Sequence, residues 1–154
     1  CQRVFSFIEK NCDNRIPKPT KLSETDIKLT ENLKKEINNL IELIDKQDLN
    51  AYIKKIVDFS FETNKYFNDS RPWAVKKEDV EKMNAILFTV VEQIKNISIL
   101  LNPIIPITSE KVLSTLNIEK KNISIQNINQ SDALDHKKSL KKLEILFPKI
   151  ENDN

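Results

Sequence analysis

The chain has 154 residues, of which 39% are hydrophobic and 31% charged, with a formal net charge of +2. This length fits one domain, or one domain with a tail, and the absence of glycine excludes glycine-rich phosphate loops and disfavours tight hairpin turns. The small net charge neither indicates nor excludes nucleic-acid binding, because a folded RNA needs only a local basic face. The composition therefore favours an all-α domain without a nucleotide site of its own.

Residues 1–12 are expected to be the end of a helix with an apolar side. Turn-forming residues at 11–14 stop it, and residues 15–19, with two prolines, are predicted to be an extended linker. The apolar side is formed by Val4, Phe5, Phe7 and Ile8.

A second helix is predicted over residues 23–45, and residues 46–48 form a short turn. Ser23 and Asp26 have the spacing of a capping box, with Asp in place of Glu. Apolar residues then recur at helical spacing: Leu29, Leu33, Ile37, Leu40, Ile41 and Ile44.

A third helix is predicted over residues 49–69, with Asp48 as its N-terminal cap. Pro72 ends it, because proline biases the preceding residue away from helical dihedrals. Trp73, the only tryptophan, is therefore expected at a helix-to-helix corner. The expected buried stripe comprises Tyr52, Ile53, Ile56, Val57, Ser60 and Phe67.

The fourth helix, residues 78–101, has the clearest apolar periodicity. A short fifth helix over 109–116 is predicted, with Thr108 as its cap. The apolar stripe of the fourth helix comprises Val80, Met83, Leu87, Val90, Val91, Ile94, Ile97 and Leu101.

Beyond the fifth helix the pattern weakens. Residues 118–131 are expected to be a loop or a lone short strand. Residues 138–154 are expected to be a short helix or an extended tail, with Leu140, Leu143, Leu146 and Phe147 packing back. The chain is thus predicted to be a bundle of about five helices over residues 1–117, followed by a loop and tail over 118–154.

Few residues suggest chemistry of their own. Cys1 and Cys12 are expected to be reduced cytosolic thiols, and three scattered Cys and His residues do not predict a zinc site. His136 lies in a polar tail, so no catalytic role is expected. No apolar run is long enough to predict a transmembrane span, and no signal peptide is expected.

Several motifs match one family in the same order along the chain. They are Cys1-Gln2-Arg3-Val4, Asn64-x-Tyr66, Pro72-Trp73, Leu100-Leu101-Asn102-Pro103-Ile104-Ile105-Pro106 and Leu146-Phe147-Pro148-Lys149-Ile150-Glu151. In this order they resemble the anticodon-binding domain of bacterial methionyl-tRNA synthetases, which are class I enzymes. Lys149 departs from the family pattern, which has Arg at that position.

The resemblance implies roles for individual residues. Trp73, aimed by Pro72, and Arg3 would hold the first base of a CAU anticodon, together with an Asn expected one turn upstream of Arg3. Arg71, Lys76 and Lys77 would contact RNA phosphates. Asn64 would support the corner through a bond to a neighbouring helix, and Tyr66 would pack with its hydroxyl at the surface.

The resemblance also implies a larger parent enzyme. A catalytic domain of the same chain would use ATP and Mg to join methionine to tRNA in the cytoplasm, without a membrane partner. Its adenylate-site signatures do not occur here, and the chain starts without Met, so we expect a C-terminal fragment with no catalytic residues, metal or cofactor.

Other interpretations stay open at this stage. A lone Trp in a helical bundle is commonly part of the core, and Arg3 and the lysines are equally consistent with a hydrated surface. The domain could belong to a sister class I synthetase for Val, Ile, Leu or Cys. It could also be a helical protein-interaction module.

Overall fold

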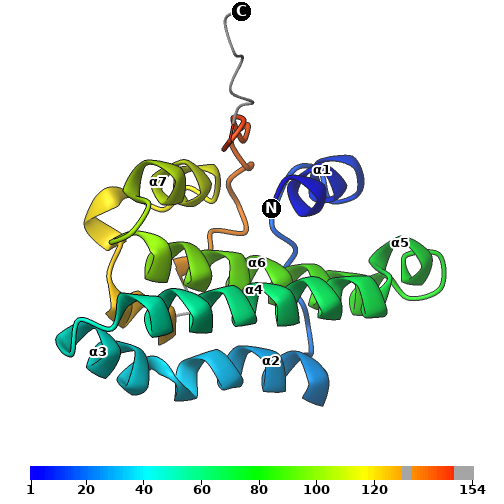
Figure 1. Cartoon of the computed structure of the whole chain (residues 1–154). Coiled ribbons are helices and arrows are strands. Elements are labelled where there is room, and N and C mark those ends of the chain that lie inside the picture. Colours follow the sequence, from blue (N-terminus) through cyan, green and yellow to red (C-terminus); the bar gives the residue numbers. More distant parts are fainter. Residues whose placement is uncertain (130–132, 148–154) are drawn as a thin grey trace, which may run out of the picture.

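Helices make up the regular structure of the described residues, 1–129 and 133–147, in this computed structural model (Figure 1). Within these residues no named strand occurs, which confirms the predicted all-α class. The α-helices are α1 (Gln2–Asn11), α2 (Glu24–Lys35), α3 (Ile37–Asp45), α4 (Leu49–Ser70), α5 (Pro72–Val75), α6 (Val80–Leu101) and α7 (Pro106–Thr115), and the 3₁₀ helices are η1 (Lys120–Asn122) and η2 (Ile125–Asn129).

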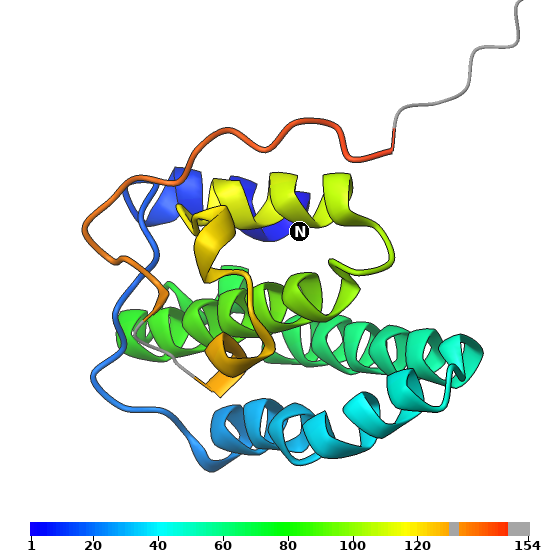
Figure 2. The same ribbon diagram turned by 90° about the vertical axis from the view of Figure 1, so that its left-hand side faces the viewer.

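Helix α6 lies at the centre of the bundle. It packs against α1, α2, α4, α5, α7 and η2. Figures 1 and 2 show three layers, with α1 and α7 on one side of the α4–α6 layer and α2 and α3 on the other. By length and composition alone α6 could cross a membrane, but 83% of its most apolar window is buried in the domain. A helix that is apolar on every side is a core helix when its neighbours surround it.

The predicted second helix is broken at a single residue, Glu36. The helical hydrogen bonding of α2 ends there, and α3 begins at the next residue. The Glu36 carboxylate accepts hydrogen bonds from Lys55 on α4, at 2.8 Å, and from Asn39, at 2.9 Å. The break lets α2 pack on both α6 and α4 while α3 continues along α4.

Polar side chains cap the N-termini of most of the predicted helices. The capping box between Ser23 and Asp26 is confirmed, and Asp48 caps α4 by accepting from the N–H of Ala51 at 3.0 Å. The predicted Thr108 cap is wrong. Helix α7 starts at Pro106 without a side-chain cap, because a proline at the first helical position already has the required φ and no N–H to satisfy.

Helices also end here without glycine. Among the described residues, five have positive φ, namely Asp13, Asn14, Gln47, Arg71 and Asn117. After α3, the N–H of Gln47 bonds to the Ile44 carbonyl and the N–H of Asp48 bonds to the Leu43 carbonyl, which is a Schellman motif. Gln47 therefore occupies a position where glycine is normally preferred.

The segment after α7 consists of short turns and an extended chain. Residues 118–129 contain η1 and η2, where a loop or lone strand was expected. The tail forms an isolated bridge between Arg15 and Ser139, and the N–H of Leu140 donates to the Asn14 carbonyl at 2.8 Å. The division at residues 117 and 118 stays a prediction, and residues 148–154 lie outside the described part.

Among the described residues, five apolar residues of the predicted stripes and tail are instead exposed, and two of them are Ile41 and Ile44, each 38% exposed. Val57 is 40% exposed, Val80 56% and Phe147 72%. Val57 is not among the buried residues of α4, and Val80 is the first residue of α6. Leu140 is buried as predicted, and Leu143 and Leu146 are partly buried against the core.

Candidate nucleic-acid interface

The corner that presents Trp73 is built by two neighbouring residues. Arg71 takes left-handed dihedrals, with φ 46° and ψ 59°, and so ends α4. Pro72 is buried and begins α5. The Arg71 carbonyl accepts hydrogen bonds from the N–H groups of Ala74 and Val75 in this short helix. The indole that follows Pro72 is 42% exposed, so it lies at the surface rather than in the core.

Arg3 reaches this corner from α1. Its guanidinium carbon lies 4.8 Å from the centre of the Phe67 ring and 5.9 Å from that of Trp73. The two rings meet edge to face, with centroids 5.8 Å apart. Arg3 Nη2 also donates to Oδ1 of Asn68 at 2.6 Å. An exposed guanidinium is therefore held beside an exposed indole, with both groups accessible from solvent.

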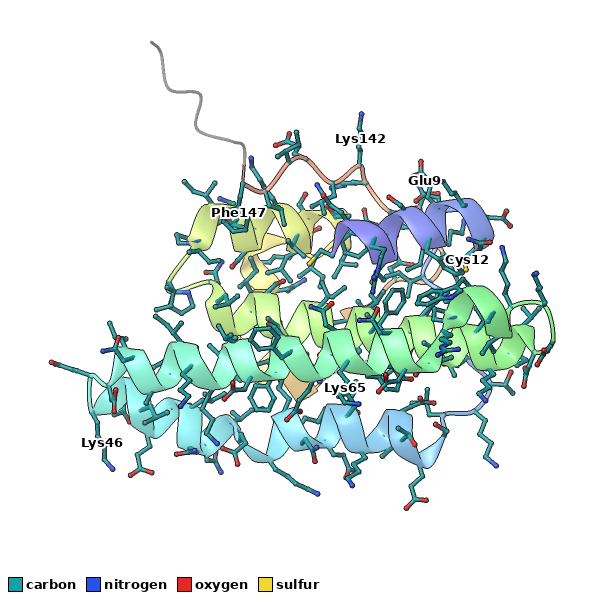
Figure 3. All side chains as sticks on the ribbon, turned by 45° about the vertical axis from the view of Figure 1, so that its right-hand side comes forward. Glu9, Cys12, Lys46, Lys65, Lys142 and Phe147 are labelled. Atoms are coloured by element: carbon teal, nitrogen blue, oxygen red, sulfur yellow. The ribbon has the colours of Figure 1, made fainter. Side chains whose placement is uncertain are left out.

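A second contact joins α1 to the end of α5. Lys76 Nζ donates to Oδ1 of Asn11 at 2.9 Å and lies 5.8 Å from the centre of the Phe7 ring. The Asn11 amide in turn donates to the Phe7 carbonyl at 2.8 Å. Figure 3 shows Cys12 at this end of α1 on the side toward α5, whereas Glu9 points away.

The other predicted basic residues are exposed but differ in setting. Arg71 forms the turn itself, and Lys77 lies in the turn that leads to α6. Within the described residues no group of three His, Cys, Asp or Glu could hold a metal ion.

Two expectations about supporting residues are wrong. The Tyr66 hydroxyl is buried and donates to Oδ1 of Asp26 on α2, instead of reaching the surface. Burial, followed by the hydrogen bond to Asp26, raises the pKa of Tyr66. Asn64 is exposed, and no hydrogen bond to another helix is found for it among residues 1–129 and 133–147. It faces outward because Thr63 and Phe67 take the buried side of this turn.

Although exposed, Asn64 also borders an apolar cavity of about 230 Å³ that is lined in part by Phe67 of the corner. The cavity lies between α1, α4, α6 and α7, and Val4 and Phe67 are among its other lining residues.

The sequence did not predict that Phe7, Asn11 and Asn68 belong to this surface, nor that Phe67 contacts Arg3. One signal was present, since Arg3, Phe7 and Asn11 follow each other at four-residue spacing on one face of α1. No local pattern reports Asn68, because its partner is 65 residues away.

The chain was compared with known proteins. Residues 16–154 match the family model described as the anticodon binding domain of methionyl tRNA ligase. A methionine–tRNA ligase of Rickettsia felis is 32% identical over 99% of this chain and 30% of its own length. One of Brucella suis is 31% identical over 76% of this chain and 23% of its own length.

Solved structures give the same fold. The apo form of Mycobacterium tuberculosis methionyl-tRNA synthetase matches with a TM-score of 0.89 at 21% identity, covering 98% of this chain and 31% of that one. A second structure of the M. tuberculosis enzyme, bound by methionyl-adenylate, matches with a TM-score of 0.88 at 22% identity, covering 96% of this chain and 30% of that one.

The chain spans less than a third of the length of these relatives. The family match covers most of the chain and includes the Pro72–Trp73 corner, while Arg3 lies before its first matched residue. The chain belongs to the family of anticodon-binding domains of methionyl-tRNA ligases.

Proposed function

We propose that this domain selects the methionine tRNA by its CAU anticodon on behalf of a cytoplasmic methionine–tRNA ligase. The relatives carry that enzyme name, and one solved relative holds methionyl-adenylate. In the parent protein, the catalytic domain would join methionine to tRNA with ATP and Mg. The residues of this domain would bind and orient the anticodon loop.

The observation that supports this proposal is the pairing of Arg3 with Trp73 at an exposed corner. Their separation of 5.9 Å, from guanidinium carbon to ring centre, allows one base to contact both groups. Sequence-specific RNA recognition mostly targets unpaired bases, which stack on aromatic rings and are read at their edges. An anticodon loop supplies such bases.

The two groups would perform different tasks. The Trp73 indole offers a flat face that replaces the stacking partner of a splayed base, worth roughly 1–3 kcal/mol. Stacking tolerates every base, so discrimination needs hydrogen bonds. A guanidinium has five N–H donors in a fixed plane, and Asn68 takes one of them. The remaining donors suit the carbonyl oxygen and ring nitrogen acceptors of cytosine.

The supporting residues would keep these two groups in place. Pro72 fixes the backbone that carries the indole, and Phe67 packs beneath the guanidinium. Arg71, Lys76 and Lys77 surround the corner with positive charge and would contact phosphates of the loop, contacts that position an RNA without reading its sequence.

Binding of anticodon stem-loops tests the proposal. The domain is titrated with a stem-loop carrying CAU and with matched loops carrying valine, isoleucine, leucine and cysteine anticodons. Tightest binding to CAU, weakening as salt rises, is the expected result. A preference for another triplet would assign the domain to a sister synthetase. Binding without salt dependence would favour a protein-interaction module instead.

A further inference from the structure

We propose that Lys76, held by Asn11 above the Phe7 ring, is a phosphate subsite for the same RNA strand whose base lies on Trp73. This inference rests on the proposed function and assigns residues of α1 that the motifs do not include. It also separates Lys76 from its neighbour Lys77.

The placement along α1 supports one continuous strand path. Arg3, Phe7 and Asn11 lie on one face of the helix, and the helical rise puts Arg3 and Asn11 about 12 Å apart. Arg3 meets Trp73 at one end of this face, and Asn11 meets Lys76 at the other. Stacked nucleotides advance by only about 3.4 Å each, so a strand bound at Trp73 is long enough to pass Lys76.

The Lys76 ammonium is positioned without being neutralised. Its hydrogen-bond acceptor is the amide oxygen of Asn11, and the bond from the Asn11 amide nitrogen to the Phe7 carbonyl fixes which way that oxygen points. An ammonium has three donors, so two are left for an anion. Among the described residues no carboxylate lies within ion-pair distance of Lys76, whereas Lys46 and Lys65 pair with Glu42 and Asp69.

Lys77 provides the contrast. It is exposed in the turn before α6 and is followed directly by Glu78 and Asp79, whose negative charges oppose an approaching phosphate. Among residues 1–129 and 133–147, the Lys77 side chain makes no hydrogen bond, ion pair or cation–π contact with α1. Adjacent lysines of equal charge thus differ in whether their ammonium group is held in place, and fixing the group beforehand lowers the entropy lost on binding.

The experiment measures affinity for the CAU stem-loop at several salt concentrations in the wild type, Lys76→Ala and Lys77→Ala. Each phosphate contact on a single strand contributes about 0.7 to the slope of log K against log salt. We expect Lys76→Ala to reduce the slope by about that amount and to weaken CAU and non-cognate loops by the same factor. Lys77→Ala is expected to reduce the slope by less than Lys76→Ala does, because the Lys77 ammonium is not held in place before the RNA binds.

Asn11→Ala keeps the charge of Lys76 but removes the hydrogen bond that positions its ammonium group. We expect weaker binding with a salt slope close to that of the wild type. Lys76→Gln keeps most of the side chain and should match Lys76→Ala in slope, which separates charge from packing. If both Lys76 variants keep the wild-type salt slope while the wild type still prefers CAU, the phosphate subsite is wrong but the proposed function is not. If the wild type fails to prefer CAU, the proposed function and the subsite are both overturned.

Discussion

Lys95 Nζ lies 2.7 Å from Oε1 of Glu92 in the middle of α6, and the two side chains are only 0% and 3% exposed. Burial raises the pKa of Glu92 and lowers the pKa of Lys95, while the attraction between the two charges acts in the opposite direction for each. Removing one member of a buried pair leaves an uncompensated charge and is strongly destabilising, even where the intact pair adds little.

Lys95→Met is therefore expected to lower the free energy of unfolding by about 3–5 kcal/mol, measured by urea denaturation, because it leaves the buried Glu92 carboxylate without this ammonium partner. Glu42→Gln is the matched control, because its pair with Lys46 is exposed on both sides and surface pairs contribute little. The control should unfold at nearly the wild-type urea concentration. Equal effects of the two substitutions would contradict the role given to burial.

The Tyr66 hydroxyl predicts how stability changes in alkali. Its raised pKa means that the folded chain keeps the phenolic proton at a pH where the unfolded chain has lost it. Stability is therefore fully present below the unfolded pKa of about 10 and falls as pH rises above it, by about 1.4 kcal/mol per pH unit. Tyr66→Phe should remove this part of the slope, as followed by denaturation at a series of alkaline pH values.

Tyr52 serves as the comparison. Burial also raises its pKa, and its hydroxyl donates to the Leu100 carbonyl at 2.6 Å. Tyr52→Phe should likewise make the alkaline loss of stability less steep. A slope in Tyr66→Phe as steep as in the wild type would show that the Tyr66 phenol ionises normally in the folded domain.

Gln47→Gly is expected to stabilise the domain by about 0.5–1 kcal/mol. Gln47 has φ 60°, and left-handed dihedrals cost a residue with a Cβ roughly 1–2 kcal/mol, part of which the greater freedom of unfolded glycine offsets. Asn117 has the same φ and closes α7 in the same way, but asparagine tolerates it better. Asn117→Gly should therefore gain less in thermal or urea unfolding, and a loss of stability in Gln47→Gly would refute the prediction.

Trp73→Ala is expected to weaken binding of the CAU stem-loop by roughly 5- to 150-fold, which corresponds to about 1–3 kcal/mol of stacking. Trp73→Phe should keep part of that affinity, because it retains a ring. Phe61→Ala is the control, since this ring is 67% exposed elsewhere on α4. Unchanged affinity in Trp73→Ala, measured by titration, would exclude the indole as a platform.

Local signals in the sequence were enough for much of the fold. Helical periodicity, together with Asp48 and the Ser23–Asp26 pair, predicted most helix starts correctly, because caps act within one turn of the backbone. Pro72 likewise predicted the corner, since its effect on the preceding residue is local. The exposed setting of Trp73 was implied by the family resemblance.

The features that were missed depend on distant partners. The break at Glu36 is accompanied by its contact with Lys55, and the buried Tyr66 hydroxyl donates a hydrogen bond to Asp26 on another helix. The bonds of Arg3 to Asn68 and of Asn11 to Lys76 each join residues 65 positions apart. Such pairings arise from tertiary packing, so they cannot be predicted from the periodicity of the sequence.

The central position of α6 has a consequence for synthesis on the ribosome. Helices α1, α2, α4 and α5 are translated first, yet all of them pack against a helix that ends at Leu101. Until that residue has left the exit tunnel, their apolar faces lack the surface that buries them, and exposed apolar segments of this kind are targets for chaperones. Nascent chains arrested before α6 should therefore be captured by chaperones, and those arrested well beyond it should resist proteolysis.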